Sequence, residues 1–145
     1  MLHRKIYSML FITLILSACT IARAKDSRCQ HEKSELNCVV TFQSVIYKEN
    51  PEYFWSVLNR ARDNALTCKS INGTSEFLRL VRITNPSTEL EEFLSEGIEK
   101  LCMEHPICFK KAQSLLDGNI QSKLSNKLLN PLYFDKKTLL CIETR

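Results

Sequence analysis

Hydrophobic residues recur along most of the chain at steps of three and four residues, which is the period of an amphipathic α-helix. The pattern is clearest after Pro51, at positions 54, 58, 61, 65 and 68, and after Pro86, at positions 90, 93, 94, 98, 101 and 102. Sustained period-2 alternation is absent, and only Val39–Phe42 has the composition of a strand. The pattern therefore predicts an all-α fold of five to seven helices.

Asn-Pro pairs punctuate this pattern at Asn50, Asn85 and Asn130. Asparagine is a preferred N-cap, and proline suits the first position of a helix. We therefore expect each pair to end one helix and to begin the next, and we expect Gly118 to end the helix that begins at Pro106. A single compact domain of helical hairpins follows from this, over 37–145, after an N-terminal tether over 19–36.

The N-terminus has the layout of a bacterial signal segment. Two basic residues precede an apolar run over 6–18. The run ends in Leu16-Ser17-Ala18-Cys19, which resembles the lipobox of bacterial lipoproteins. The resemblance implies removal of 1–18, acylation of Cys19 and, because Thr20 rather than Asp follows, an anchor in the outer membrane facing the periplasm.

Two other fates of this segment stay open. Ala22-Arg23-Ala24 fits the rule for ordinary signal peptidase, which would remove 1–24 and release a soluble periplasmic protein. The apolar run also extends to Ala22, close to the roughly 17 residues that a membrane-spanning helix needs, so an uncleaved anchor is a third alternative.

Composition excludes some classes of function. The chain is 44% hydrophobic and 25% charged, so it can bury a core. Its formal charge is +4, and Arg4 and Lys5 supply two of these charges, which leaves only +2 after the signal segment is removed. This is too weak a charge to favour nucleic acid as a partner.

An even set of cysteines in an exported chain predicts disulfide bonds. Besides Cys19 there are six: Cys29, Cys38, Cys68, Cys102, Cys108 and Cys141. Two antiparallel helices joined at Asn85 would place Cys68 beside Cys102, because each is 17 residues from that turn. We therefore predict Cys68–Cys102, together with Cys108–Cys141 and Cys29–Cys38. The main alternative is Cys102–Cys108.

Metal binding is the other chemistry that cysteines suggest. Cys102, His105 and Cys108 lie close together, but a fourth ligand is missing and an oxidising compartment favours bonds between thiols. We expect no metal or other cofactor. Nucleophile, zinc and phosphate-loop motifs are also absent, so no small-molecule substrate is predicted.

The helix after Pro86 carries several carboxylates along one side: Glu89, Glu92, Glu96 and Glu99. They form either an ordinary solvated helix face or a docking surface for a basic partner. Phe54 belongs to the core pattern, and Tyr53 and Trp55 on either side of it cannot share its face. These two aromatic residues are therefore candidates for an exposed anchor in the same partner surface.

Three functions remain for such a chain. The first is a non-enzymatic envelope lipoprotein that binds another protein, for instance an inhibitor or immunity factor against a periplasmic toxin or hydrolase. The second is an accessory subunit of an envelope secretion or conjugation machine. The third is a small hydrolase of envelope polymers that uses two glutamates of the acidic helix.

Overall fold

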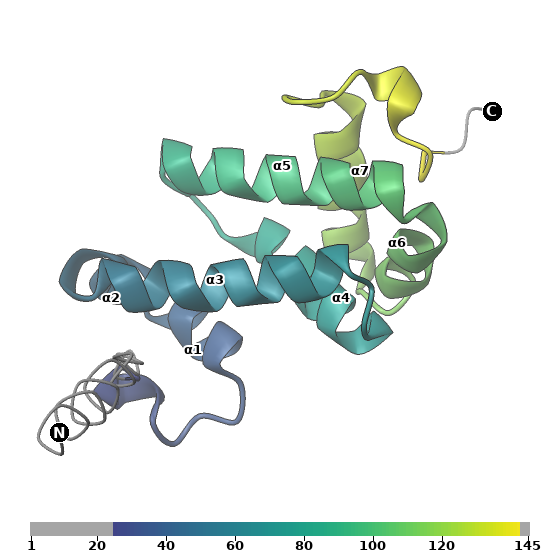
Figure 1. Ribbon diagram of the computed structural model, residues 1–145. Helices are drawn as coiled ribbons and strands as arrows, with labels where there is room; N and C mark the ends of the chain where they lie inside the picture. Colours follow the sequence, from purple (N-terminus) through teal and green to yellow (C-terminus); the bar gives the residue numbers. More distant parts are fainter. Residues whose placement is uncertain (1–24, 143–145) are drawn as a thin grey trace, which may run out of the picture.

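The protein, described here by a computed structural model over residues 25–142, is built of helices joined by short loops (Figure 1). No strand occurs in the described part of the chain, and the predicted all-α class is confirmed. The predicted signal segment, Cys19 and the alternative cleavage site after Ala24 lie outside the described residues. In chain order the elements are η1 (Ser27–Cys29), α1 (Glu35–Thr41), α2 (Gln43–Glu49), α3 (Pro51–Leu66), α4 (Ile71–Leu78), η2 (Arg79–Arg82), α5 (Thr88–Glu104), α6 (Pro106–Gln113), α7 (Gly118–Leu129) and η3 (Lys136–Thr138).

The first two Asn-Pro pairs behave differently. Asn50 caps α3 as predicted, because its side-chain oxygen accepts a hydrogen bond from the Tyr53 N–H at 3.3 Å and Pro51 is the first residue of the helix. Asn85 does not cap α5, which begins later and is capped by Ser87. Asn85 instead has a left-handed backbone with φ of 54°, a conformation that asparagine tolerates better than most residues.

Two further local predictions are wrong, those for Asn130 and Gly118, and the strand-like composition of 39–42 does not lead to a strand. Asn130 ends α7, but a loop rather than a helix follows its proline. Gly118 begins α7 instead of ending a helix, because Asp117 accepts from a backbone N–H of the first turn and caps α7 there. The segment 39–42 lies in α1 and the turn after it, since Ser34 caps that helix and its apolar residues are buried on one face.

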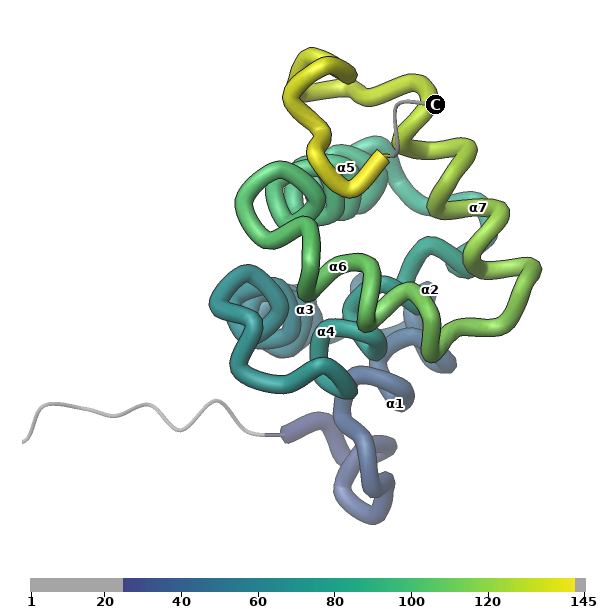
Figure 2. The backbone as a smooth tube through the Cα atoms, turned by 90° about the vertical axis from the view of Figure 1, so that its right-hand side faces the viewer, coloured from purple at the N-terminus to yellow at the C-terminus, as the bar shows by residue number. Residues whose placement is uncertain are grey.

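Helices α3 and α5 pack together and run in the same direction (Figures 1 and 2). The chain returns between them through α4 and η2, so Asn85 is not the tip of a hairpin that joins them directly. Gly97 of α5 lies at a close approach of these elements: a Cβ at this position would be 2.7 Å from Cζ of Phe77 in α4 and 3.2 Å from Cγ and Cδ of Arg62 in α3.

The core lies between α3, α4, α5 and α6. Phe54, Phe77 and Phe109 come from three of these helices and are its largest fully buried side chains. α6 packs on α4, and α7 packs on η2. The segment after α7 passes over the outer side of α5, as the yellow part of Figure 1 shows.

Three disulfides connect these elements: the N-terminal bond Cys29–Cys38, the bond Cys68–Cys108, and the C-terminal bond Cys102–Cys141. We call Cys68–Cys108 the α3–α6 bond, because Cys68 lies in the turn directly after α3 and Cys108 lies in α6. The N-terminal bond is the pair that the sequence predicted. The predicted pair Cys68–Cys102 is wrong, because it assumed antiparallel helices on either side of Asn85. The predicted pair Cys108–Cys141 is also wrong, because it assumed a final helical hairpin, and a loop rather than a helix follows α7. The alternative Cys102–Cys108 bond does not form either.

The described part of the segment predicted as a tether, 25–36, contacts the helices. Asp26 and Cys29 are buried. The Asp26 carboxylate accepts from the Arg28 N–H at 3.0 Å, and Arg28 forms an ion pair with Glu49 of α2. This segment therefore packs against the domain from η1 onward.

Candidate functional site

Four aromatic rings from α2, α3 and α5 form a connected cluster at the start of the two parallel helices. We call Tyr47, Phe54, Trp55 and Phe93 the aromatic cluster. Their edge-to-face contacts have centroid distances of 5.2 Å for Tyr47–Phe54, 5.3 Å for Phe54–Trp55 and 5.4 Å for Trp55–Phe93. Phe54 is fully buried, whereas the other three rings are only partly buried. The cluster thus joins the core to the surface.

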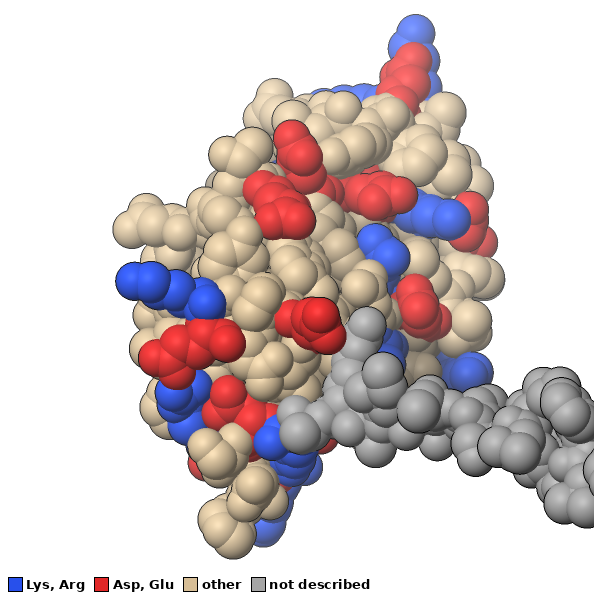
Figure 3. Space-filling view, turned by 60° about the vertical axis from the view of Figure 1, so that its left-hand side comes forward, with Lys and Arg blue, Asp and Glu red and all other residues tan. Residues whose placement is uncertain are grey.

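Carboxylates surround the exposed side of this cluster. The acidic face, as we name it, consists of Glu52, Glu89, Glu92 and Glu96, all of which are exposed. Glu52 precedes Trp55 by three residues and so lies on the same side of α3. On α5, Glu89 lies about one turn before Phe93 and Glu96 lies about one turn after it. Figure 3 looks at the side where α3 and α5 begin and shows carboxylates spread over uncharged surface.

One hydrogen bond and one arginine connect the acidic face to the aromatic cluster. The Tyr47 hydroxyl donates to Glu89 at 2.9 Å, and this bond raises the pKa of Tyr47. The Arg62 guanidinium lies 4.5 Å from the centre of the Phe93 ring and 3.7 Å from Glu96. Glu92 and Glu52 form no ion pair with any described residue. The surface therefore keeps an excess of negative charge.

Two of the six residues that the sequence assigned to this surface are not on it. Glu99 is fully buried, because the segment after α7 covers the second half of α5. Its carboxylate accepts from three backbone N–H groups, those of Leu132 at 2.7 Å, Tyr133 at 2.9 Å and Phe134 at 3.0 Å. Glu99 thus holds the loop after α7 and is not available to a partner.

Tyr53 is also buried, with 3% of its surface exposed. The residues whose charges act on it, Glu35, Arg60 and Asp26, belong to the N-terminal segment and the side of α3 that faces it. That segment covers Tyr53, and burial raises the pKa of its phenol. Of the aromatic pair proposed as an anchor, the structure therefore leaves only Trp55 at the surface.

Sequence reasoning missed several residues of this surface: Glu52, Tyr47, Phe93 and Arg62. The three-residue spacing of Glu52 and Trp55 was a usable signal. Arg62 follows Trp55 by seven residues, or about two turns, on the same side of α3. Tyr47 joins the surface only through tertiary contacts, which no local spacing indicates. In the loop after α7, partial desolvation and then the charges of Glu92, Glu96 and Glu99 raise the pKa of the exposed Tyr133.

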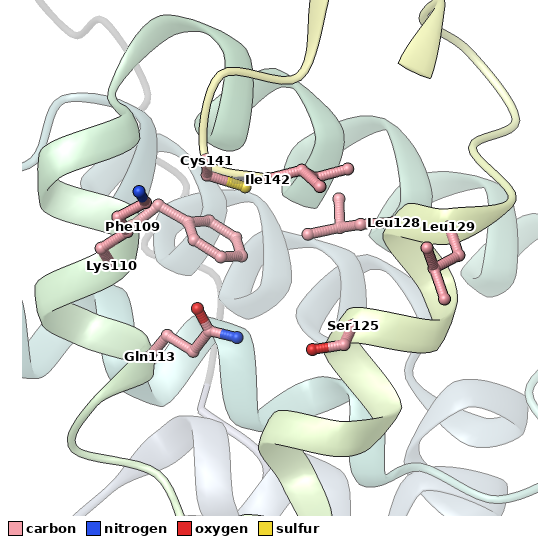
Figure 4. Close-up of a pocket in the computed structure, with 8 residues that line it drawn as sticks. All are labelled: Phe109, Lys110, Gln113, Ser125, Leu128, Leu129, Cys141 and Ile142. Atoms are coloured by element: carbon pink, nitrogen blue, oxygen red, sulfur yellow. The ribbon is translucent and has the colours of Figure 1, made fainter. Parts of the chain in front are cut away.

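The remaining candidate chemistry finds no support in the described residues. No group of three His, Cys, Asp or Glu side chains is arranged for a metal, and Cys102 and Cys108 are bound in different disulfides. A hollow of about 330 Å³ lies between α6, α7 and the chain end (Figure 4). Its lining contains no carboxylate, imidazole or free thiol: Phe109, Lys110, Gln113, Ser125, Leu128, Leu129, Cys141 and Ile142.

Comparison of the chain with protein-family models, with curated proteins and with solved structures finds no match. Within 25–142, none of the helices has the length and the apolar character required to cross a bilayer. The aromatic cluster and the acidic face around it are therefore the best-defined candidate site in the described part of the chain.

Proposed function

We propose that the protein is a non-enzymatic, lipid-anchored protein of the bacterial cell envelope that binds a basic protein through the acidic face and the aromatic cluster. The observation that carries this proposal is the position of Trp55. Its ring contacts Phe93 on the neighbouring helix, remains partly exposed and belongs to a surface with four exposed carboxylates, of which Glu52 lies on the same side of α3. An inhibitor or immunity factor of a periplasmic toxin or hydrolase is a function of this kind.

The chemistry of the surface supports a basic partner. Tryptophan is among the residues that most often dominate binding free energy in protein interfaces. A field of one sign steers an oppositely charged partner and fixes its orientation. The Arg62–Phe93 contact at 4.5 Å within the protein itself has the geometry of a cation–π pair. Lysine or arginine side chains of a partner have the same option on the exposed part of Trp55.

Three disulfides support the predicted address, because such bonds persist in oxidising compartments such as the periplasm. The lipid anchor rests on the lipobox resemblance at Cys19. Intact mass of protein from an envelope fraction tests both points. Triacylated Cys19 with six further thiols that appear only after reduction is the expected result, and a chain that begins at Lys25 would exclude the anchor.

The hydrolase alternative has less support, because most carboxylates of α5 are already engaged. Glu99 is buried under three N–H donors, Glu91 pairs with Lys127, and Glu96 pairs with Arg62. The accessory-subunit alternative uses the same surface and differs in the size of the complex. Co-purification with a large envelope assembly, rather than with one soluble protein, would favour it.

Site-specific photocrosslinking in the producing cells tests the surface directly. A photoreactive phenylalanine analogue is placed at Glu92 and, as a control, at the exposed Glu32 near the N-terminus. We expect a discrete crosslinked protein of basic surface from position 92 only. In a second set of proteins the photoreactive residue replaces Trp55. There the charge reversals Glu92→Lys and Glu96→Lys should abolish crosslinking, whereas Glu32→Lys should not. Equal crosslinking from both positions, or insensitivity to the reversals, would refute the proposal.

A further inference from the structure

A second, separate feature is a polar hollow of about 500 Å³ between α1, α4, η2 and the turn after α6. Six of the seven side chains that line it are polar or charged. Asn37 comes from α1, Asn72 and Ser75 from α4, and Arg79 and Arg82 from η2. None of these residues belongs to the acidic face or the aromatic cluster.

Ser75 marks this hollow as unusual. It is only 3% exposed, and its hydroxyl has no hydrogen-bond partner in the described structure. Ser95 shows the ordinary arrangement for a buried helical serine: it is equally enclosed, but its hydroxyl donates to the Glu91 carbonyl at 2.8 Å. A buried polar group without a partner is unfavourable, so an acceptor that reaches the enclosed Ser75 hydroxyl from the hollow would relieve this cost.

The two arginines of the hollow also retain most of their donors. Arg79 donates to the Leu115 carbonyl at 3.2 Å, and Arg82 approaches Asn37 Oδ1 at 3.5 Å. Neither forms an ion pair with a described residue. A guanidinium has five N–H donors, so the site holds many more donors than acceptors. Glu76 also lines it and is the one carboxylate that opposes an anion there.

We propose that this hollow binds the phosphate group of a phosphorylated ligand. Two guanidinium groups match the geometry of phosphate oxygens, and the hydroxyl of Ser75 and the amide groups of two asparagines add neutral donors. The volume lies in the range of roughly 300–1,000 Å³ that is usual for small-molecule pockets. The polar lining favours a polar ligand. A soluble phosphate ester and a phospholipid headgroup share this chemistry. The proposal does not depend on the protein-binding function of the acidic face.

The test uses glycerol 3-phosphate as the probe, with glycerol and chloride at equal ionic strength as controls, and follows the arginine Nε–H resonances by NMR. We expect saturable shifts at Arg79 and Arg82. Arg79→Gln and Arg82→Gln should each weaken binding by at least about tenfold. Glu76→Gln should strengthen it by removing repulsion. Arg60→Gln, an exposed arginine outside the hollow, should leave it unchanged.

Ser75→Ala separates binding from folding. Because the hydroxyl makes no bond within the protein, its removal should leave thermal stability unchanged or higher, yet weaken binding by about three- to tenfold. The proposal would be overturned by resonance shifts that do not saturate, or by arginine and Ser75 variants that bind glycerol 3-phosphate as tightly as the wild type does.

Co-sedimentation of the Cys19→Ala protein, which cannot carry the proposed anchor, with vesicles of phosphatidylglycerol or of phosphatidylcholine distinguishes the two sources. Retention on phosphatidylglycerol that is lost in Arg79→Gln assigns a headgroup. Binding of glycerol 3-phosphate without vesicle retention assigns a soluble ester, and binding of neither overturns the proposal.

Discussion

Replacing Gly97 by alanine is expected to destabilise the protein, although alanine is the better helix former by about 1 kcal/mol. The added Cβ would lie 2.7 Å from Phe77 Cζ, and Phe77 is fully buried, so the ring must move within the core. Overpacking of this kind costs about 1–3 kcal/mol. After the gain in helix propensity, we expect the free energy of unfolding to fall by about 1 kcal/mol.

Gly73 of α4 provides a matched control. A Cβ at this position would meet only the Ser70 side chain, with its nearest atom at 3.7 Å, an ordinary contact. Gly73→Ala should therefore stabilise the protein by about 0.5–1 kcal/mol. Because both substitutions gain the same helix propensity, the difference between the two variants measures the clash itself, about 1–3 kcal/mol.

Urea unfolding measures both effects, with the disulfides intact and with the fluorescence of Trp55 as the signal, since it is the only tryptophan of the chain. A rescuing substitution, Phe77→Leu in the Gly97→Ala background, should recover part of the loss because it removes the clashing ring atom. If Gly97→Ala stabilises the protein as much as Gly73→Ala does, the close approach of α4 and α5 at this glycine is refuted.

Three other outcomes are expected. Glu99→Gln should lower the free energy of unfolding by about 2 kcal/mol, because a buried amide keeps at most two of three charge-assisted bonds, and urea unfolding beside the exposed Glu92→Gln variant checks this. Tyr47 should ionise above its ordinary pKa. Its bond to Glu89 should therefore stabilise the fold below about pH 10 and cease to do so as the pH rises through the raised pKa. Ultraviolet titration of the wild type and of Glu89→Gln measures this shift, and equal titration midpoints in the two proteins would contradict it. Replacing both cysteines of the α3–α6 bond by alanine should lower the free energy of unfolding by about 4 kcal/mol, and replacing those of the N-terminal bond should lower it by about 3 kcal/mol. The difference follows from loop-closure entropy, because the two loops span 40 and 9 residues. Thermal unfolding of both variants tests this order, and a larger loss of stability at the N-terminal bond would contradict it.

The long helices could be predicted from sequence because their determinants are local. The three- and four-residue spacing of apolar residues identifies the buried faces of α3 and α5. Asn50-Pro51 contains both the cap and the first residue of α3, so its start was predictable. The start of α5 was not, because Ser87 competes with Asn85 for the same role and the left-handed backbone of Asn85 removes it from the cap position.

The connectivity of the disulfides could not be predicted from the same information. Equal distances from Asn85 place Cys68 beside Cys102 only if two helices meet directly at that turn. The chain between α3 and α5 instead forms α4 and η2, which carry it back along the core and make α3 and α5 parallel. Cys108 then reaches Cys68 through the packing of α6 on α4, a contact that depends on the whole fold.

The candidate site shows the same division. Helix periodicity correctly places Glu92, Glu96 and Glu99 on one side of α5, because 3.6 residues form a turn. It does not indicate which part of that side another segment covers. The loop after α7 crosses its second half, so Glu92 remains at the surface while Glu99, seven residues later, becomes a buried acceptor of three hydrogen bonds.

Glu99 and Ser75 show two opposite arrangements of a buried polar group in this protein. Both are polar residues within helices, and both are almost completely enclosed. The Glu99 carboxylate is fully provided with donors from the chain, which is the arrangement that stability alone requires. The Ser75 hydroxyl has no partner and lies in a hollow with two arginines that form no ion pair in the described structure. An anionic ligand in the proposed phosphate site would supply the acceptors that these three groups lack.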